Sequence, residues 1–391
     1  MKRVLTTARM VTTEAKMVTE AMVEIVEGSA KMQYNQKEAV FYNKVQVFNR
    51  DTSIQVIRLF AETLNRERKD KYERKLQNYR NQLLNPNAET SQGKNMMARE
   101  PFPPPAGVSI LDALAATGLR SVRYCKEITN GDGAPPLLRS MVINDLSPDA
   151  TKAAMANCIS NGVDLNTVQI ETRDATSLMY EHREPNLNFD VIDLDPYGTA
   201  CPFIDSAVQA ISDGGLLIVT CTDSPVLSGN YPEVCFAKYG CMPVKAKYHS
   251  EMSLRILLNA LETAANRYKR YVVPWLSLSV DFYVRVFVRV FESPSEVKNS
   301  SFKRCMLFQS TQCPSFYLQV CLKMYLYVPL YIYLVCTSIY HYVPLYTCTF
   351  SLLGSPRVNG RTIRRPSHER KVKRSRRKRK ARMREIPWGL M

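Results

Sequence analysis

The fold of this 391-residue chain is decided by the stretch Asp190-Val191-Ile192-Asp193-Leu194-Asp195-Pro196-Tyr197-Gly198. Its apolar residues predict a buried strand of an α/β sheet, and Pro196 cannot continue a strand ladder, so the strand ends at Asp195. Asp195 and Tyr197 are therefore expected at the carboxyl edge, where ligands of open parallel sheets bind. An acid followed by proline and a flat ring suits a planar, amine-bearing base, although ordinary turns use the same residues.

Strand and helix patterns alternate around this stretch, which predicts an α/β fold with a doubly wound, mostly parallel sheet. A turn of small residues at 113–118 follows the first strand and allows a ligand to approach the backbone and the start of the next helix. Ser147 and Pro148 are expected to begin another helix. A later helix and two strands, at 250–268, 275–280 and 282–291, are expected to close the sheet antiparallel. The predicted parallel strands are residues 108–112, 141–145, 167–171, 190–195 and 215–223.

The first four strands each end at or just before an aspartate: Asp112, Asp145, Asp174 and Asp195. These acids are expected to gather at one edge of the sheet. Together they favour a cationic, adenosine-bearing cofactor, S-adenosylmethionine, over a phosphorylated ligand, which would need basic residues and a glycine-rich loop. Asp145, at the end of the second strand, occupies the position that binds ribose hydroxyls in this architecture.

The segment before the first of these strands is more varied. Residues 1–27 are expected to form a leader; no apolar core follows the basic start, so we expect no secretory signal, whereas a mitochondrial presequence stays open. Asp51, Thr52 or Ser53 could cap a helix with apolar residues at 54, 57 and 60. Arg50 before it is either a solvated charge or a guanidinium aimed at a carboxylate. The charge-dense residues 66–80 and the Asn-, Gly-, Ser- and Pro-rich residues 85–105 predict a long exposed insertion.

The formal charge of +17 is concentrated near the end of the sequence. Residues 357–384 hold 15 Lys or Arg and one Glu, a net charge of +14, which leaves +3 for the rest. Any nucleic-acid footprint on the body must therefore come from a local patch. Eleven cysteines without a C-x-x-C pair indicate free thiols in a reducing, intracellular compartment rather than disulfides or a zinc site.

Ten ordered motifs carry a family resemblance that covers roughly residues 26–319. They lie at residues 41–43, 49–51, 111–120, 144–145, 174–175, 195–198, 221–223, 238–240, 255–258 and 281–290. Together they resemble the Trm1 family, the tRNA (guanine-26, N2)-dimethyltransferases. The resemblance implies a class I S-adenosylmethionine-dependent methyltransferase (Rossmann-like) domain, here residues 28–292, that dimethylates guanosine 26 of tRNA.

The same resemblance implies roles for individual residues. The expected contacts to S-adenosylmethionine are Arg50, Arg120, Asp145, Asp174 and Ala175, to which the strand-end position adds Asp112. The target guanine is expected to be held by Phe41, Asp195, Pro196 and Tyr197. Core packing is the alternative role for the two aromatic residues.

The resemblance weakens toward the end of the sequence. Residues 293–319 resemble the start of the family's carboxyl-terminal domain, but Ser310 stands where a paired cysteine is expected and leaves Cys313 alone, so we predict no structural metal site. Residues 320–391 are expected to be a low-complexity, disordered tail, because prolines interrupt their apolar repeats and disfavour a membrane span. The basic run indicates a nuclear-localisation or nucleic-acid-binding segment.

Two functions stay open at this stage. One is an active tRNA dimethyltransferase that works as a monomer with tRNA and not with a membrane, in the nucleus or alternatively the mitochondrion. The other is a catalytically impaired methyltransferase-fold tRNA-binding protein that lacks the terminal tRNA-docking domain. The motifs do not separate the two, because both would retain them.

Overall fold

The computed structural model describes residues 22–35, 42–84, 99–129, 136–311, 313 and 315–320, all within one compact unit. Three regions on which expectations were placed lie outside these residues: the first 21 residues of the expected leader, most of the expected insertion (85–98), and nearly all of the expected tail (321–391). Phe41 also lies outside them.

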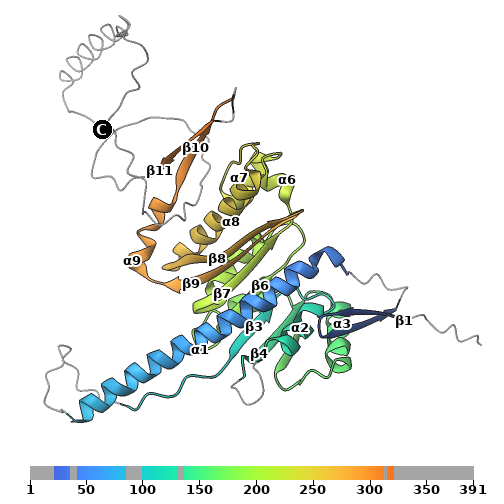
Figure 1. The fold of residues 1–391 in the computed structure, drawn as a ribbon, viewed down its shortest axis with the longest axis vertical. Coiled ribbons are helices and arrows are strands. Elements are labelled where there is room, and N and C mark those ends of the chain that lie inside the picture. Colours follow the sequence, from blue (N-terminus) through green and yellow to red (C-terminus); the bar gives the residue numbers. More distant parts are fainter. Residues whose placement is uncertain are drawn as a thin grey trace, which may run out of the picture. The chain divides into compact units, whose positions relative to one another are not determined.

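Seven strands form the central sheet, in the order β5-β4-β3-β6-β7-β9-β8 (Figure 1). The first five in sequence are parallel, and β9 lies antiparallel between β7 and β8. The predicted doubly wound sheet with an antiparallel closure is confirmed. The strands are β3 Val108–Asp112, β4 Leu138–Asp145, β5 Val168–Thr172, β6 Phe189–Leu194, β7 Ile211–Cys221, β8 Arg270–Val280 and β9 Tyr283–Glu292.

Helices cover both faces of this sheet. On one face α1 (Val47–Leu84), α2 (Leu119–Glu127) and α3 (Pro148–Ser160) enclose a core that includes Val191 of β6. On the other, α4 (Ala175–Glu181), α5 (Cys201–Ala210) and α8 (His249–Asn266) enclose a core that includes Ile192 and Leu194. Successive strand residues point to opposite faces, so a strand buried on both faces needs the continuous apolar run seen in the sequence.

The start and length of α1 differ from the sequence-based expectation. The helix begins at Val47, after a 3-10 turn (η1, Lys44–Gln46) that is capped by the side chain of Asn43, whose Oδ1 accepts the Val45 N–H at 2.9 Å. The expected cap at Asp51–Ser53 is wrong, because the helix has already begun at Val47 and these residues lie inside it, where the Ser53 hydroxyl donates to the Asn49 carbonyl at 2.6 Å and Asp51 pairs with Arg123. Residues 66–84 continue the same helix and are not part of an insertion.

The expected leader boundary at residue 27 is also wrong. Strands β1 (Met22–Glu27) and β2 (Ala30–Asn35) form an antiparallel hairpin that belongs to the folded unit. Glu27 is 5% exposed, and its carboxylate accepts hydrogen bonds from Arg50 at 2.6 and 2.7 Å and from Arg123 at 2.8 Å. A buried carboxylate with two guanidinium partners ties the hairpin to α1 and α2.

Smaller elements complete the unit. Residues after β9 form α9 (Pro294–Val297), a 3-10 turn η2 (Ser300–Lys303) and the antiparallel hairpin β10 (Cys305–Gln309) and β11 (Phe316–Val320). They are attached to α8, whose buried Glu262 accepts hydrogen bonds from Ser300 at 2.5 Å and Lys303 at 2.9 Å. The short helices α6 (Ser224–Leu227) and α7 (Pro232–Tyr239) follow β7.

The described residues contain neither a candidate membrane span nor a candidate metal cluster. No helix among them combines the length and apolar character needed to cross a membrane. The same residues hold no cluster of three or more His, Cys, Asp or Glu side chains that could bind a metal ion.

Candidate active site

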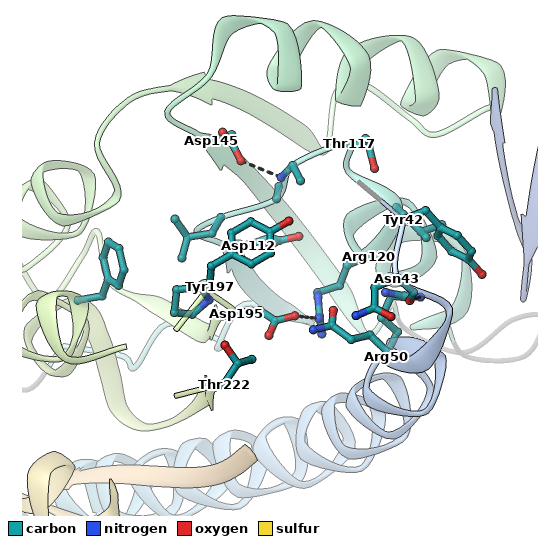
Figure 2. A pocket seen from close by; sticks show the side chains of 17 residues that line it. Tyr42, Asn43, Arg50, Asp112, Thr117, Arg120, Asp145, Asp195, Tyr197 and Thr222 are labelled. Atoms are coloured by element: carbon teal, nitrogen blue, oxygen red, sulfur yellow. Dashed lines mark hydrogen bonds and ion pairs between the residues drawn. The ribbon is translucent and has the colours of Figure 1, made fainter. Parts of the chain in front are cut away.

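A cavity of about 440 Å³ opens at the carboxyl ends of the central strands. It lies where the strand order reverses between β3 and β6, which is where open α/β sheets bind ligands. Its volume falls in the range of roughly 300–1,000 Å³ that is typical of small-molecule sites. Three of the four strand-end acids line it, Asp112, Asp145 and Asp195, together with Pro196 and Tyr197 (Figure 2).

The fourth strand-end acid has a different position. Asp174 follows β5 and caps α4, where its Oδ2 accepts the Ser177 N–H at 2.8 Å. Its neighbour Ala175 is 3% exposed and packs in the core. Neither residue is among those that line the cavity.

The turn after β3 shapes one wall of the cavity. Gly118 has a φ of 75°, and a Cβ at this position would lie 2.8 Å from the Cβ of Ala154, so glycine permits the close approach of α3. Ala116 also has a positive φ, and its N–H donates to Asp145 Oδ2 at 2.8 Å. The other oxygen of Asp145 accepts the Ser147 N–H at 2.9 Å. The carboxylate is thereby fixed, and each oxygen keeps a lone pair for a ligand hydroxyl.

Asp195 belongs to a network of buried charges beneath the cavity. Arg120 forms ion pairs with both Asp195 and Asp193, and Figure 2 shows the Arg120 and Asp195 side chains pointing toward each other. Arg285 binds both oxygens of Asp193, at 3.0 and 2.9 Å, and one of its nitrogens lies 4.0 Å from Asp195 Oδ1. The Tyr124 hydroxyl donates to Asp193 at 2.6 Å. Two cations thus face two carboxylates in a buried site.

The protonation of neighbouring acids follows from these contacts. Burial alone would raise the pKa of Asp193, but the guanidinium groups of Arg285 and Arg120 hold it below its ordinary value. Burial raises the pKa of Asp112 to about 7, although the Arg120 charge opposes the shift. Asp112 also accepts the Ser121 hydroxyl at 2.6 Å. The site therefore contains a carboxyl group that changes charge near neutral pH.

One oxygen of Asp195 is left for a ligand. Asp195 Oδ1 is buried and has no hydrogen-bond partner among the described residues. A buried acceptor without a donor costs free energy, so such atoms in native sites call for a ligand or water. The loop after Asp195 is held to Thr222 by two hydrogen bonds. The Gly198 N–H donates to Thr222 Oγ1 at 2.7 Å, and the Thr222 N–H donates to the Gly198 carbonyl at 2.7 Å. Tyr197, 74% exposed, stands at the cavity mouth.

Arg50 also lines the cavity, but its charge is already paired. Its guanidinium binds Glu27, as described above, and donates to the Asn43 carbonyl at 3.1 Å. Of the two alternatives left open by the sequence, the guanidinium aimed at a carboxylate is confirmed, and the carboxylate is the chain's own. The Tyr42 ring lies beside it, with its centroid 5.6 Å from the guanidinium carbon.

Comparison with known proteins identifies a family that this chain matches. The chain matches the model described as TRM, N2,N2-dimethylguanosine tRNA methyltransferase, over residues 19–352. The chain belongs to this family. The match begins before residue 26 and ends after residue 319, the limits of the motif-based resemblance.

Several family members give the extent of the similarity. The mouse tRNA (guanine(26)-N(2))-dimethyltransferase is 43% identical over 312 residues, which are 77% of this chain and 46% of that protein. The mitochondrial enzyme of Saccharomyces cerevisiae is 41% identical over 308 residues, 75% of this chain and 52% of that protein. The chain spans about half the length of the curated relatives it matches.

A solved structure supports the fold assignment. Trm1 from Pyrococcus horikoshii, in complex with S-adenosyl-L-methionine, superposes with a TM-score of 0.58 at 26% identity, over 76% of this chain and 69% of that one. Together with the strand order, this similarity shows the class I, Rossmann-like methyltransferase fold that the sequence predicted.

Four residues that shape the cavity or the charge network beneath it were not expected from the sequence. They are Asp193, Arg285, Tyr124 and Thr222, of which only Thr222 lines the cavity. A signal existed for two of them. Asp193 and Arg285 each interrupt an apolar strand, and a charge in a fully buried strand requires an opposite charge because an unpaired buried ion is costly.

Proposed function

We propose that this chain transfers methyl groups from S-adenosylmethionine to the exocyclic N2 amine of guanosine 26 in tRNA, forming N2,N2-dimethylguanosine. The observation that carries the proposal is Asp195, a carboxylate at the end of β6 with one buried oxygen that lacks a donor. Family membership supports it, as do the names of the relatives and the S-adenosyl-L-methionine complex of the Pyrococcus protein.

The residues of the cavity fit this cofactor. Asp145 has lone pairs available for ribose hydroxyls, and the turn at 115–117 presents backbone to a ligand. Three acids line the cavity and its two arginines are already paired with carboxylates, which suits a ligand whose sulfur carries positive charge. We assign Asp112, Asp145 and Arg120 to the cofactor, with Arg50 at the far end of the lining. Asp174 and Ala175 keep their proposed cofactor contacts on the grounds of the family resemblance, although they do not line the cavity. When bound, S-adenosylmethionine supplies an electrophilic methyl group.

The chain's own residues would prepare the guanine amine. The lone pair of this amine is delocalised into the ring, so the nitrogen is a poor nucleophile until it becomes pyramidal. Asp195 Oδ1 and the Pro196 carbonyl would accept its two N–H bonds, and Asp195 would then receive the proton that the methylated nitrogen releases. Oriented reactants can reach effective molarities on the order of 10⁵ M, so this positioning supplies much of the rate.

The base must leave its helix before its edge can be reached. Tyr197 offers an exposed ring at the cavity mouth for a base to stack on. Phe41 keeps its proposed stacking role on sequence grounds alone. Arg120 and Arg285 would hold the Asp195 carboxylate in place while the base enters.

Mass spectrometry of tRNA after incubation with the purified chain and S-adenosylmethionine tests the proposal. We expect a mass increase of two methyl groups on guanosine 26 and none on a tRNA with adenosine at that position. Unmodified tRNA that nevertheless binds the chain would favour the alternative, an impaired methyltransferase-fold tRNA-binding protein. The experiment includes this alternative because the chain spans about half the length of its relatives.

We further propose that the chain acts on tRNA as a monomer and in the nucleus, with the mitochondrion as the alternative. The basic run in residues 357–384 supports a nuclear location, and the yeast relative, which is named as a mitochondrial enzyme, supports the mitochondrial one. A fluorescent fusion with and without residues 357–384 tests the location. Loss of nuclear signal on deletion is expected, and an unchanged mitochondrial signal would contradict the nuclear assignment.

A further inference from the structure

Helix α1 is longer than the surface it covers. Residues in its first half, such as Ile57 and Phe60, are fully buried, whereas most side chains from Arg66 onward are exposed. The last buried charges that bind the helix are Arg289, which holds Glu67 at 2.8 Å, and Asp190, which accepts from Arg68 at 2.5 Å. Figure 1 shows the far half of α1 extending beyond the sheet and its covering helices.

The face that packs on the domain continues into this far half. Eighteen residues make about five turns, so Lys71 lies above Ser53 on the helix surface and Lys75 lies above Ile57. Ser53 and Ile57 are both 0% exposed, and Ser53 accepts a hydrogen bond from Arg285 beneath the cavity. Beyond the domain, the exposed part of this face is basic, whereas Tyr72 and Tyr79, which lie above Ile54 and Ala61 on the same face, are half-buried.

Five residues at helical spacing form this exposed face, which we call the basic stripe: Lys71, Arg74, Lys75, Asn78 and Gln82. All five side chains are exposed, and the stripe includes no acid. Ion pairs within 4 Å among the described residues involve none of its three cations. Cations and amides in one row are the groups that contact RNA phosphates and ribose hydroxyls.

Two of the three acids in residues 66–84 pair with cations outside the stripe, and the third, Asp70, is exposed beside it, four residues before Arg74. Glu67 is bound by Arg289, as noted, and Glu73 lies 3.9 Å from Lys69 on the opposite flank. Residues 66–84 carry seven Lys or Arg and three Asp or Glu, a net charge of +4. Because the chain outside residues 357–384 has a net charge of +3, the rest of it is slightly acidic, and this segment holds the excess of positive charge.

We propose that the basic stripe binds the sugar-phosphate backbone of the RNA whose base enters the cavity. Gln46, just before α1, and Arg50, in its first turn, line the cavity, and Lys71 follows Arg50 by 21 residues, about 32 Å along the helix axis. One rigid element thus joins the site of the reacting base to a distant row of cations. That the RNA is a tRNA rests on the proposed function. That the stripe binds phosphate groups rests on its own cations and does not depend on that function.

A matched pair of triple variants of the full chain tests the proposal. One removes the stripe cations (Lys71→Gln, Arg74→Gln, Lys75→Gln). The control removes equal charge from the opposite flank of the same helix (Arg66→Gln, Lys69→Gln, Arg80→Gln), whose side chains are also exposed. Fluorescence anisotropy gives the tRNA Kd at several KCl concentrations, and circular dichroism checks that both variants keep the wild-type helix content and melting temperature.

The stripe variant should lower the slope of log K against log salt by about 2 to 3, because each lost phosphate contact removes nearly one unit. At 0.15 M salt this corresponds to tRNA binding weaker on the order of 10- to 100-fold. The control should change the slope by less than about one unit. Equal losses in the two variants, or no loss in either, would overturn the proposal.

A separate readout distinguishes this proposal from the proposed function. Both variants should bind S-adenosylmethionine as wild type does and should reach wild-type turnover at saturating tRNA, because the stripe lies outside the cavity. If the wild-type chain binds tRNA but does not methylate guanosine 26, the proposed function fails while the slope comparison still decides the role of the stripe.

Discussion

Replacing Asp195 with asparagine would change one charge at the centre of the site with little change in volume. The variant keeps a carbonyl oxygen but turns an N–H₂ group toward Arg120 or toward the guanine amine, both of which are donors. Loss of a preorganised electrostatic partner typically lowers turnover by about 10²- to 10³-fold, or roughly 2.7 to 4 kcal/mol. We therefore expect turnover at least about 10²-fold lower than wild type.

The structure also indicates what should survive this change. Arg120 would still bind Asp193 at 3.2 Å and Asn49 at 3.0 Å, so the loss of one charged hydrogen bond should cost about 1.5 to 3 kcal/mol of unfolding free energy without unfolding the domain. S-adenosylmethionine affinity should stay within about threefold, roughly 0.7 kcal/mol, because Asp112 and Asp145 are unchanged.

Single-turnover methylation of tRNA with radiolabelled S-adenosylmethionine measures the rate, and calorimetry measures the cofactor Kd. The matched control is Asp149→Asn, the same chemical change at a side chain that is 94% exposed on α3. A rate near wild type in Asp195→Asn would remove this residue from the mechanism. Equal losses in rate and in cofactor affinity would instead make it a cofactor ligand.

Three further predictions follow from the same site and charge distribution. Asp145→Ala should weaken S-adenosylmethionine binding by about 1 to 3 kcal/mol, since a ribose hydroxyl loses its acceptor, and an unchanged Kd by calorimetry would contradict this role. Asp112 has a pKa of about 7 in the native state, above its ordinary value of 3.8. Between these two pH values the native state keeps a proton that the unfolded chain has lost, so the free energy of unfolding should fall as the pH rises toward 7. In urea titrations, wild type should lose about 1 to 3 kcal/mol more than Asp112→Asn between pH 5 and 8, and identical pH profiles would refute the shift. Deleting residues 357–384 should weaken tRNA binding and flatten its salt dependence without changing cofactor affinity. The salt slope that remains measures the contribution of the rest of the chain, including the basic stripe. An unaltered slope would show that residues 357–384 take no part in binding.

Local patterns were sufficient for the main features of the fold. The continuous apolar runs predicted strands buried on both faces, and the cap Ser147 with Pro148 predicted the start of α3, where the Ser147 hydroxyl accepts the Ala150 N–H. Strand ends marked by aspartates predicted the position of the site, because all parallel strands present their carboxyl ends at one edge. Asp112, Asp145 and Asp195 do meet there.

Other features depended on partners far away in the sequence. The charge density of residues 66–80 indicated an insertion, because a helix that leaves the domain has no apolar face to produce a helical period. Glu27 was placed in a leader because its partners, Arg50 and Arg123, are separated from it by 23 and 96 residues.

The sequence by itself determined the order of strands and helices, the closely spaced small residues of the first turn and the acids at the strand ends. Only the tertiary structure decided which charges share the site. Asp193 and Arg285 are 92 residues apart and meet because β9 inserts beside β7, which places Arg285 opposite Thr220 and lets its side chain reach across β7 to Asp193 of β6. Periodicity records only whether a side chain is buried, whereas the identity of its neighbours depends on the lateral order of strands in the sheet, which local sequence does not encode.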